Sequence, residues 1–494
     1  MEEEYIRLIF GLKLKQIRVD KSLSSFGLAK ISGLSKSYLN EIENGKKYPK
    51  RDKIIILAQV LDTTYDHLVS LKLDKNLAPI GEILQSRILK EIPFDLFGIK
   101  ESDLISIISE APVKVNAFIS TLFEIAKHYN LGKENFFLAA LRSYQEAHNN
   151  YFENIENDVE RFAKEYSIDL SRRLQVKDLE DILIQVYGYV INNDELGEHE
   201  ELTNLRSIFV PKTKTLLVSQ QADDPQRLFI YAKEIGYNFL NITDRLYTFS
   251  WIKFDSFDQV LNNFIASYFA GALLIPRKLL VKELKSFFDS TVFIPQNFHN
   301  LMLKFTDSPE TFYQRLTNVL PKDFNLKNIF FLRFTYKPEY NQFQLTKELH
   351  ITNLQEPYAN ESNEHYCRRW VTLKTLNEIP NSNENHLFEA QISCYNFTEN
   401  QYLVLASATK DPFKQGYYRS IGLGVLISAH AQSKINFLKD TNINKIEVGV
   451  TCESCSIKKC NERAASPRRI EKQERFAKTD QTVQYLMQKY STTF

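Results

Sequence analysis

The most constraining feature of this sequence is a tight turn between two short helical patterns within residues 24–45. Ser24 and Ser35 each stand where a side chain can cap the N-terminus of the helix that follows. Gly33 lies in the turn between the helices, where a positive φ is needed, and Gly45 ends the second helix. Helices this short are stable only when they pack together. The apolar side chains expected to lock them together are Ala29, Leu34, Leu39 and Ile42.

The second helix would present its polar N-terminal half to solvent, which is where a recognition helix meets base edges in the major groove of DNA. Asn40 can pair bidentately with adenine, and Lys36 can reach guanine or a phosphate. The lysines that follow this helix suit backbone phosphates. The side chains that we expect at DNA are Lys36, Ser37, Tyr38, Asn40, Lys46, Lys47 and Lys50. The alternative is a helical hairpin that binds no DNA.

This segment resembles the helix-turn-helix domain of the XRE (Cro/CI-type) family. The string SYLNEIENGKKYP is similar to the recognition helix and the loop after it, and residues 8–70 would span a five-helix domain. The resemblance implies double-stranded DNA as the partner, bound by a homodimer at half-sites about one helical turn apart. Ser25 stands where the family usually has Gln, so this expected DNA contact is weaker here.

Local charge favours a polyanionic partner, although the chain as a whole is almost neutral. The chain has 62 basic and 61 acidic side chains. Residues 12–53 nevertheless contain eleven basic and four acidic residues, and residues 456–478 contain eight and three. Such a local excess is the electrostatic footprint of a partner such as nucleic acid. The alternative for either segment is a solvated helix face.

Length and composition favour several folded domains and no membrane partner. A chain of 494 residues that is 43% hydrophobic exceeds what one core needs, so we expect three or four domains. Its apolar runs reach about eight residues, short of the roughly 20 that cross a bilayer. The acidic start MEEEYIRL lacks the order of a signal peptide. Three of the five cysteines lie within nine residues, which favours a cytoplasmic protein with a metal centre.

Patterning along the chain predicts a multidomain protein. An all-α helix-turn-helix domain would occupy residues 1–72, and a helical connector and dimerisation region residues 80–170. An α+β domain would follow at 171–290, and an α+β C-terminal sensor domain with a Cys-rich loop and a basic tail at 291–494. The expected strands are residues 207–210, 215–218, 329–336, 343–351, 387–395 and 402–408.

Residues 225–277 resemble the zinc-binding part of ImmA/IrrE-type metallopeptidases. The string PQRLFIYAKEIGYNFLNI is similar to the helix that carries H-E-x-x-H in that family. Lys233 and Tyr237 stand at the two histidine positions, and Asn263 stands at the third-ligand position of the next helix. Only Glu234, at the general-base position, matches. We therefore expect a degenerate domain without activity; the alternative is an XRE-linked zinc metallopeptidase.

A Cys-rich loop near the C-terminus predicts a metal centre. Cys452, Cys455 and Cys460 could grip one centre with a fourth ligand from elsewhere. We expect Cys367 to be that ligand, because the two arginines after it would favour a thiolate or offset an anionic cluster. Cys394 falls in an alternating strand and is expected to be a buried small hydrophobe. Spacing leaves zinc, an iron–sulfur cluster and three free thiols as alternatives.

The whole chain resembles the short-chain fatty acyl transcriptional regulators, which join an XRE helix-turn-helix, a degenerate ImmA/IrrE-like domain and a Cys-rich C-terminal domain. The matching strings are IPFDLFGI, LRSYQEAHNNYF, HYCRRW, SIGLG and CESCSIKKCNERAASP. The resemblance implies a regulator, not an enzyme, whose C-terminal half senses a short-chain acyl-CoA and holds a [4Fe–4S] cluster. Residues 325–430 are rich in aromatic, Arg and Lys side chains, as a site for an acyl chain beside phosphates needs, although such aromatics are more often core.

Overall fold

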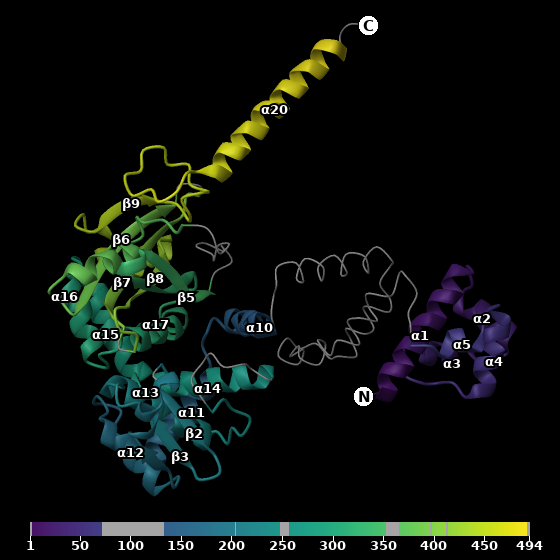
Figure 1. Ribbon diagram of the computed structural model, residues 1–494, viewed down its shortest axis with the longest axis horizontal. Coiled ribbons are helices and arrows are strands. Elements are labelled where there is room, and N and C mark those ends of the chain that lie inside the picture. Colours follow the sequence, from purple (N-terminus) through teal and green to yellow (C-terminus); the bar gives the residue numbers. More distant parts are fainter. Residues whose placement is uncertain are drawn as a thin grey trace. The chain divides into compact units, whose positions relative to one another are not determined.

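The computed structural model describes residues 2–71, 133–202, 204–247, 256–351, 365–395, 398–411 and 413–491. The chain divides into two compact units, which are described separately (Figure 1). The N-terminal unit comprises residues 1–140 and 255–257, and the α+β unit comprises residues 141–254 and 258–494. Most of the connector expected at residues 80–170 lies outside the described residues. The helices described within that range are α10 (Lys133–Ala147) and α11 (Glu153–Glu165).

Five helices make up the N-terminal unit as far as residue 71. They are α1 (Glu2–Asp20), α2 (Ser25–Ser32), α3 (Lys36–Glu43), α4 (Arg51–Val60) and α5 (Tyr65–Val69). The expected caps are confirmed, because Ser24 Oγ accepts a hydrogen bond from Gly27 N and Ser35 Oγ accepts one from Tyr38 N. Gly33 has a φ of 68°, the left-handed conformation that the turn between α2 and α3 requires.

One apolar core holds these five helices together. Leu28, Leu39 and Ile42 are fully buried in it, so α2 and α3 pack against each other as the sequence predicts. Ala29 and Leu34 pack at the edge of the core and are half-buried. Burial of these side chains supplies the free energy that helices of eight residues cannot gain from their own hydrogen bonds.

Two of the eleven basic residues counted in this segment are buried and cannot contact DNA. Arg18 of α1 forms a bidentate pair with Glu43 of α3, with N–O distances of 2.6 and 2.8 Å. Lys13 Nζ donates to the carbonyl oxygen of His67 at 2.9 Å and to Ser70 Oγ at 2.7 Å. The sequence count therefore overestimates the basic surface, because these two cations hold α1 against α3 and against the end of α5.

The α+β unit begins with a three-stranded sheet and its helices. The strands are β1 (Val190–Asn192), β2 (Ser207–Val210) and β3 (Thr215–Val218), in the order β1-β3-β2. β2 and β3 have the predicted bounds and pair antiparallel, whereas the unpredicted β1 pairs parallel with β3. The helices of this part are α12 (Val176–Gln185), α13 (Asp224–Phe239) and α14 (Phe257–Leu274).

A six-stranded sheet with the order β5-β4-β8-β7-β6-β9 forms the rest of the unit. Its strands are β4 (Ile329–Lys337), β5 (Gln342–Ile351), β6 (His386–Tyr395), β7 (Gln401–Lys410), β8 (Tyr418–Leu426) and β9 (Asn444–Val448). The sequence does not predict β8, because Gly422 and Gly424 interrupt its apolar pattern. Gly424 is needed there, since a Cβ at this position would lie 2.2 Å from the ring of Phe330.

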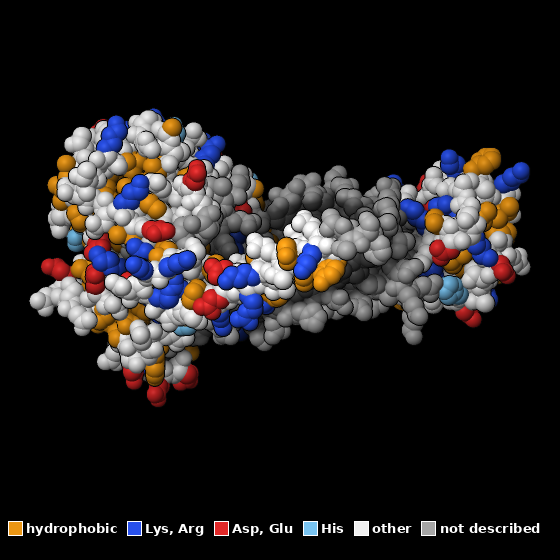
Figure 2. Space-filling model, turned by 90° about the horizontal axis from the view of Figure 1, so that it is seen from above, with side chains coloured by type: hydrophobic (Ala, Val, Ile, Leu, Met, Phe, Trp, Pro, Cys, Tyr) orange, Lys and Arg blue, Asp and Glu red, His pale blue; other side chains and the backbone are white. Residues whose placement is uncertain are grey.

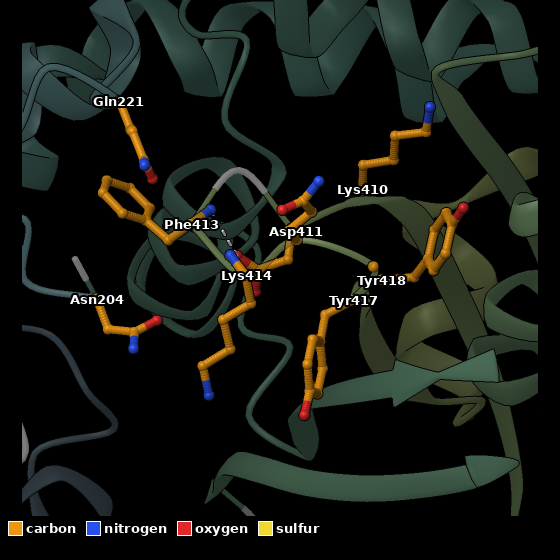
Figure 3. Close-up of a pocket in the computed structure, with 10 residues that line it drawn as sticks. Asn204, Gln221, Lys410, Asp411, Phe413, Lys414, Tyr417 and Tyr418 are labelled. Carbon is orange, nitrogen blue, oxygen red and sulfur yellow. Dashed lines mark hydrogen bonds between the residues drawn. The ribbon is translucent and has the colours of Figure 1, made fainter. Parts of the chain in front are cut away.

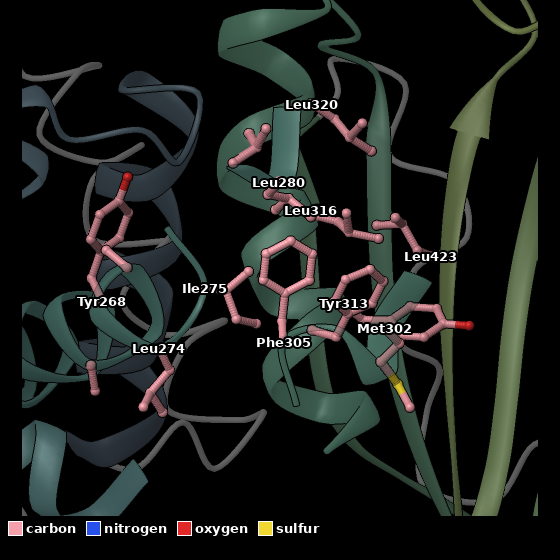
Figure 4. Packing of buried hydrophobic residues seen from close by; sticks show 14 of the residues in the cluster. Tyr268, Leu274, Ile275, Leu280, Met302, Phe305, Tyr313, Leu316, Leu320 and Leu423 are labelled. Carbon is pink, nitrogen blue, oxygen red and sulfur yellow. The ribbon is translucent and has the colours of Figure 1, made fainter. Parts of the chain in front are cut away.

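Both faces of the six-stranded sheet are buried. Successive side chains of a strand point to opposite faces, so Phe331 joins one apolar core and Phe330 joins another. The helices in contact with the sheet are α16 (Pro295–Leu303), α17 (Pro309–Asp323) and α18 (Val371–Glu378). Figure 4 shows Leu316 of α17 beside Leu423 of β8, within the core that contains Phe331.

The larger core is continuous from the small sheet to the six-stranded sheet. It extends in sequence from Phe152 to Ile443, so the boundary expected at residue 290 divides side chains that pack together. Within this core, Arg315 of α17 pairs with Glu156 of α11, with N–O distances of 2.6 and 2.9 Å. Arg315 Nε also donates to the carbonyl oxygen of Ile275 at 3.0 Å. This buried pair ties the two sheet-bearing parts into one body.

The remaining elements are shorter or peripheral. The helices are α15 (Arg277–Asp289), α19 (Ala429–Lys434) and α20 (Arg468–Ser491). The 3-10 turns are η2 (Glu195–Glu198), η3 (Glu200–Leu202), η4 (Pro338–Tyr340), η5 (Ile379–Asn381) and η6 (Asn436–Lys439). Among the described residues, no single helix combines the length and apolar character that a membrane span needs, whereas α14 and α15 together meet both criteria but are bent by 64°.

Candidate functional site

Helix α3 presents an exposed polar surface at its N-terminal half. Lys36, Ser37 and Asn40 are exposed, and the first two lie in the first turn of the helix. Tyr38 is half-buried, because its ring packs against the apolar core of the domain. Ser25, the first residue of α2, is also half-buried. Three of the side chains expected at DNA therefore project from α3 into solvent, at the end of the helix that enters a major groove in helix-turn-helix proteins.

Three lysines follow α3 on the same unit. Lys46, Lys47 and Lys50 are exposed, and Lys50 stands at the N-cap position of α4. Lys47 Nζ lies 3.4 Å from Glu41 Oε2 and 5.3 Å from the centre of the Tyr38 ring. An exposed pair of this kind contributes about 0.2–1 kcal/mol, so a DNA phosphate can replace it. Figure 2 shows Lys and Arg side chains on the surface of this unit, with acidic side chains between them.

In the α+β unit, the three positions matched to zinc ligands lie around one point. Lys233 Nζ of α13 donates to Asn263 Oδ1 of α14 at 2.6 Å, and Tyr237 OH donates to the same oxygen at 3.3 Å. An ammonium group repels Zn²⁺, and a neutral phenol is a poor ligand for it. The three side chains thus form a hydrogen-bonded group and do not fit the metal.

Glu234, at the general-base position, belongs to a buried ion pair. Both of its carboxylate oxygens accept hydrogen bonds from Arg245 Nη2, at 2.5 and 2.7 Å, and one accepts a hydrogen bond from Tyr189 OH at 3.0 Å. The Arg245 guanidinium also lies 3.9 Å from the centre of the Tyr237 ring. The direct ionic partner of Glu234 is therefore Arg245, which lies 11 residues further along the chain. A carboxylate held in this way is not directed at a metal-bound water.

Burial changes the protonation of the lysine in this group. The pKa of Lys233 is lowered to about 7, mainly by burial; Glu234 acts in the opposite direction, and the nearby cation Arg245 acts in the same direction as burial. Burial also raises the pKa of Tyr237, so its phenol stays neutral. Two more cations that lower the pKa of Lys233 are Lys347 and Arg206, which belong to a separate basic cluster.

That basic cluster surrounds Glu310 in the first turn of α17. Arg333 Nη1 donates to both Glu310 oxygens at 2.9 Å, and the cationic nitrogens of Lys347 and Arg419 lie 3.3 and 3.9 Å from the carboxylate. Burial by itself would raise the pKa of Glu310, but these cations hold it well below its usual range. Burial lowers the pKa of Arg206, the fourth cation near Glu310, and Arg419 and Arg333 lower it further.

The cations of this cluster come from distant segments of the chain. Arg333 of β4 is the register partner of Lys347 of β5, Arg419 lies on β8, and Arg206 precedes β2. Four cations facing Glu310 give a local surplus of positive charge, which favours an anionic ligand nearby. The sequence names none of these residues individually; the one signal is the abundance of Arg and Lys in residues 325–430.

A cavity of about 920 Å³ borders this cluster. Its lining residues are Asn204, Gln221, Lys410, Asp411, Phe413, Lys414, Gln415, Gly416, Tyr417 and Tyr418. The Arg206 guanidinium lies 5.0 Å from the centre of the Phe413 ring, and Tyr418 precedes Arg419 on β8. Figure 3 shows that most of the lining side chains come from the loop between β7 and β8. Its volume falls in the range of small-molecule and cofactor sites.

The four cysteines expected as metal ligands line one small cavity. Cys367 comes from the segment before α18, and Cys452, Cys455 and Cys460 come from the loop before α20. Burial raises the pKa of Cys367 to about 11. Among the described residues, no group of three or more His, Cys, Asp or Glu side chains is arranged to hold a metal ion.

Basic and N–H groups surround the same thiols. Arg368, Arg369 and Arg463 line the cavity with the cysteines, and the backbone N–H of Ala464 lies 3.3 Å from Cys452 Sγ. Arg463 Nη1 donates to the carbonyl oxygen of Cys452 at 2.9 Å. Arginine and N–H groups of this kind stabilise the sulfur atoms of an anionic iron–sulfur cluster. Cys394 lies on β6, is half-buried and does not line the cavity.

A buried carboxylate joins the two segments that carry the cysteines. Glu453 accepts hydrogen bonds from the backbone N–H of His365 at 3.0 Å and lies 2.8 Å from His365 Nδ1. Burial by itself would raise the pKa of Glu453, but these interactions with His365 keep it low. The sequence gives His365 no role, because its partner lies 88 residues away. The pair positions Cys367 beside Cys452.

A family match supports the interpretation of the N-terminal unit as a helix-turn-helix domain. Residues 14–68 match the family model described as Helix-turn-helix. No curated protein matches the chain. A solved structure of a Mycobacterium tuberculosis transcriptional regulator is similar, with 18% identity over 66% of this chain and 92% of that chain and a TM-score of 0.47. The family match shows that the N-terminal segment is a helix-turn-helix domain, the class of domain that binds double-stranded DNA.

Replacing Lys233 with Met is expected to remove a pH dependence of stability. The unfolded chain keeps a proton on this lysine up to about pH 10.5, whereas the folded chain releases it at about pH 7. Stability therefore rises with pH between these values, by at most about 1.4 kcal/mol per pH unit. Thermal unfolding midpoints of the wild type and the Lys233→Met variant should converge or cross as the pH rises through this window.

The matched control is Lys282→Met, which changes an exposed lysine of α15. Its unfolding midpoint should follow that of the wild type at every pH. If the unfolding midpoints of the wild type and the Lys233→Met variant changed in parallel with pH, burial would not lower the pKa of Lys233.

Proposed function

We propose that this protein is a transcriptional regulator that reads specific DNA sequences through α3 and responds to a small anionic metabolite bound by the α+β unit. The observation that carries the proposal is a helix-turn-helix domain whose second motif helix exposes Lys36, Ser37 and Asn40. Amide and ammonium groups are those that read adenine and guanine in the major groove. The lysines after α3 would contact backbone phosphates and set the register on the duplex.

The effector that we propose is a short-chain acyl-CoA. The cavity beside the Glu310 cluster offers Lys410 and Lys414 for phosphate groups and Tyr417 as an aromatic surface for an adenine ring. The positive surplus around Glu310 would attract a ligand that carries several phosphates. This proposal also agrees with the resemblance to short-chain fatty acyl regulators, which the sequence strings indicate.

Regulation would then be a shift between two populations of the same protein. A ligand changes such an equilibrium only if it binds one conformation more tightly than the other. In this proposal, the acyl-CoA favours one arrangement of a dimer, and that arrangement decides whether both recognition helices fit successive major grooves. The cations beside the cavity suit this role, because an anion that neutralises them stabilises the conformation in which they lie together.

We also propose that Cys367, Cys452, Cys455 and Cys460 hold an iron–sulfur cluster. The support is that four thiols from two distant segments line one cavity together with three arginines. When bound, such a cluster supplies one-electron redox chemistry and makes the site sensitive to oxygen. The residues of this chain would provide the thiolate ligands and the N–H groups around the sulfur atoms.

A peptidase activity is not favoured by the residues at the degenerate zinc position. Lys233, Tyr237 and Asn263 bond to one another, and Glu234 is held by Arg245. The proposed role of this part of the chain is structural, as a wall of the effector cavity and a support for α17.

The DNA contacts can be tested with the protein's own upstream DNA. Asn40→Ala and Lys36→Ala are each expected to weaken specific binding by about 1–3 kcal/mol if the side chain reads a base. Lys50→Ala should instead weaken binding to all sequences alike and lower the salt dependence by about one counterion. Fluorescence anisotropy at several salt concentrations separates the two effects. Unchanged affinity in both α3 variants would show that α3 is not the recognition helix.

The effector site can be tested by calorimetric titration with propionyl-CoA. The double variant Lys410→Ala/Lys414→Ala is expected to bind at least about tenfold more weakly, because each lost charge–phosphate bond is worth roughly 1.5–3 kcal/mol. Both lysines are exposed, so their removal should leave the fold intact. Lys445→Ala, an exposed lysine of β9 outside the cavity, is the control.

The outcomes of this titration separate three cases. Tight binding of propionyl-CoA with weak binding of propionate supports a CoA-recognising site. Equal binding of pyrophosphate and propionyl-CoA would show that the site reads phosphate alone. Unaltered propionyl-CoA binding in the double variant, or none in the wild type, would contradict the assignment of the cavity.

The cluster can be tested by purification without oxygen, followed by iron analysis and visible spectroscopy. The wild type is expected to be brown and to contain about four iron atoms per chain, the content of a [4Fe–4S] cluster. Cys367→Ser, Cys452→Ser, Cys455→Ser and Cys460→Ser should each lose most of the iron, whereas Cys394→Ser should keep it. A colourless protein that contains one zinc ion per chain would contradict the cluster and indicate a structural zinc site instead.

A further inference from the structure

Helix α20 carries a row of large apolar side chains that the α+β unit leaves uncovered. The helix runs from Arg468 to Ser491 as one unbroken element after the Cys-rich loop (Figure 1). Every residue from 471 to 490 is exposed. The row, called here the α20 stripe, consists of Phe476, Val483, Leu486, Met487 and Tyr490, with exposed fractions of 62%, 47%, 43%, 70% and 66%. Exposed apolar side chains gathered in this way mark an interaction surface.

The spacing of the stripe fits a partner helix of the same kind. Phe476, Val483 and Tyr490 are each seven residues apart, and Leu486 follows Val483 by three. At about 100° per residue, all five members of the stripe fall within an arc of about 100°. Tyr485, also exposed, points to the opposite side of the helix. A seven-residue repeat keeps the apolar row along the seam between two supercoiled helices, whereas a lone helix against a flat surface has no need of it.

We infer that α20 pairs in parallel with α20 of a second copy of this chain and forms a short two-stranded coiled coil. Phe476, Val483 and Tyr490 then occupy the first core position of each heptad, and Thr479 and Leu486 occupy the second. The pairing is isologous, as a two-fold dimer requires, because each helix offers the same row to the other. The paired segment of residues 475–490 is roughly 24 Å long.

Charges beside the stripe specify a parallel pair in this register. Arg475 precedes the core residue Phe476, and Asp480 lies five residues later. In a parallel coiled coil, the residue just before a first core position of one helix faces the residue five positions later in the other helix. Arg475 of each copy thus meets Asp480 of the other, which gives two symmetric ion pairs. Within its own helix, Asp480 accepts a hydrogen bond from Gln484 at 2.9 Å, which leaves its other oxygen for this contact.

The basic start of α20 sets where the pairing begins. Arg469 and Lys472 stand at the core positions before Phe476, and like charges at these positions repel between two copies. The helices therefore diverge toward Arg468, where the backbone N–H of Arg469 donates to the carbonyl oxygen of Glu453 at 3.0 Å. Each α20 is thus attached to the Cys-rich loop of its own chain. The dimer is expected to depend on concentration, because only two heptads are paired.

A second copy is the occupant that these features favour over other partners. The complementary charges lie on the helix itself, so the surface is self-complementary. Two copies are also what paired DNA half-sites require, a reason that rests on the proposed function. The spacing of the α20 stripe and the charges beside it support the pairing independently of the proposed function.

Sedimentation velocity of the full chain without DNA, over a wide range of concentration, tests the inference. The wild type is expected to form a dimer, and Val483→Asp and Leu486→Asp are each expected to raise its dissociation constant at least about tenfold, because a charge enters the apolar seam. Tyr485→Asp is the matched control: it adds the same charge at an exposed site on the opposite side of the helix and should leave the dimer unchanged. A monomeric wild type, or an unaffected dimer in the Val483→Asp variant, would overturn the inference.

A charge exchange tests the direction of the pair. Arg475→Glu and Asp480→Arg should each weaken the dimer, and the double variant Arg475→Glu/Asp480→Arg should restore it. A double variant as weak as the single variants would overturn the parallel register. Because no DNA is present, failure here is distinct from failure of the proposed function, which α3 variants test separately. A dimer that Tyr485→Asp disrupts and Val483→Asp does not would place the contact on the other side of α20.

Discussion

The buried ion pair between Arg315 and Glu156 is the interaction on which the arrangement of the α+β unit depends. It joins α17, which covers the six-stranded sheet, to α11, which precedes the three-stranded sheet. Two charges without water are stable only when each is hydrogen-bonded, and Ile275 and Tyr268 complete the bonding. Because α17 is fixed in this way, Glu310 at its start stays among cations from three strands and one loop. The contact between α11 and α17 therefore helps to hold the basic cluster together.

Local signals in the sequence account for the elements that could be predicted. Serine caps and a glycine in the turn define α2 and α3 within a few residues, and the family match over residues 14–68 agrees with them. Alternating apolar residues give β2 and β3 their bounds. β8 could not be predicted, because it needs Gly422 and Gly424 for close packing and these residues hide its pattern. The short strands β1 and β9 carry too few residues for a pattern to appear.

The sequence predicts the candidate site less well than the fold, because the contacts within the site join segments that lie far apart in the chain. The resemblance brought Lys233, Tyr237 and Asn263 together, but it could not reveal that Arg245 neutralises Glu234. The cations around Glu310 lie up to 213 positions apart in the chain, from Arg206 to Arg419. Near the N-terminus, the count of basic residues overestimates the positively charged surface, because Arg18 and Lys13 are buried and hold helices together.

The central claim is that this chain reads DNA as a pair of helix-turn-helix domains, and selection from a pool of random duplexes tests it most directly. The intact protein, prepared without oxygen, would be incubated with the pool and the bound sequences enriched. The account requires an inverted repeat whose half-sites are centred about one helical turn apart, and its loss when Asn40 is replaced by Ala. Enrichment of no sequence by the intact protein, or the same motif in the Asn40→Ala variant, would contradict it.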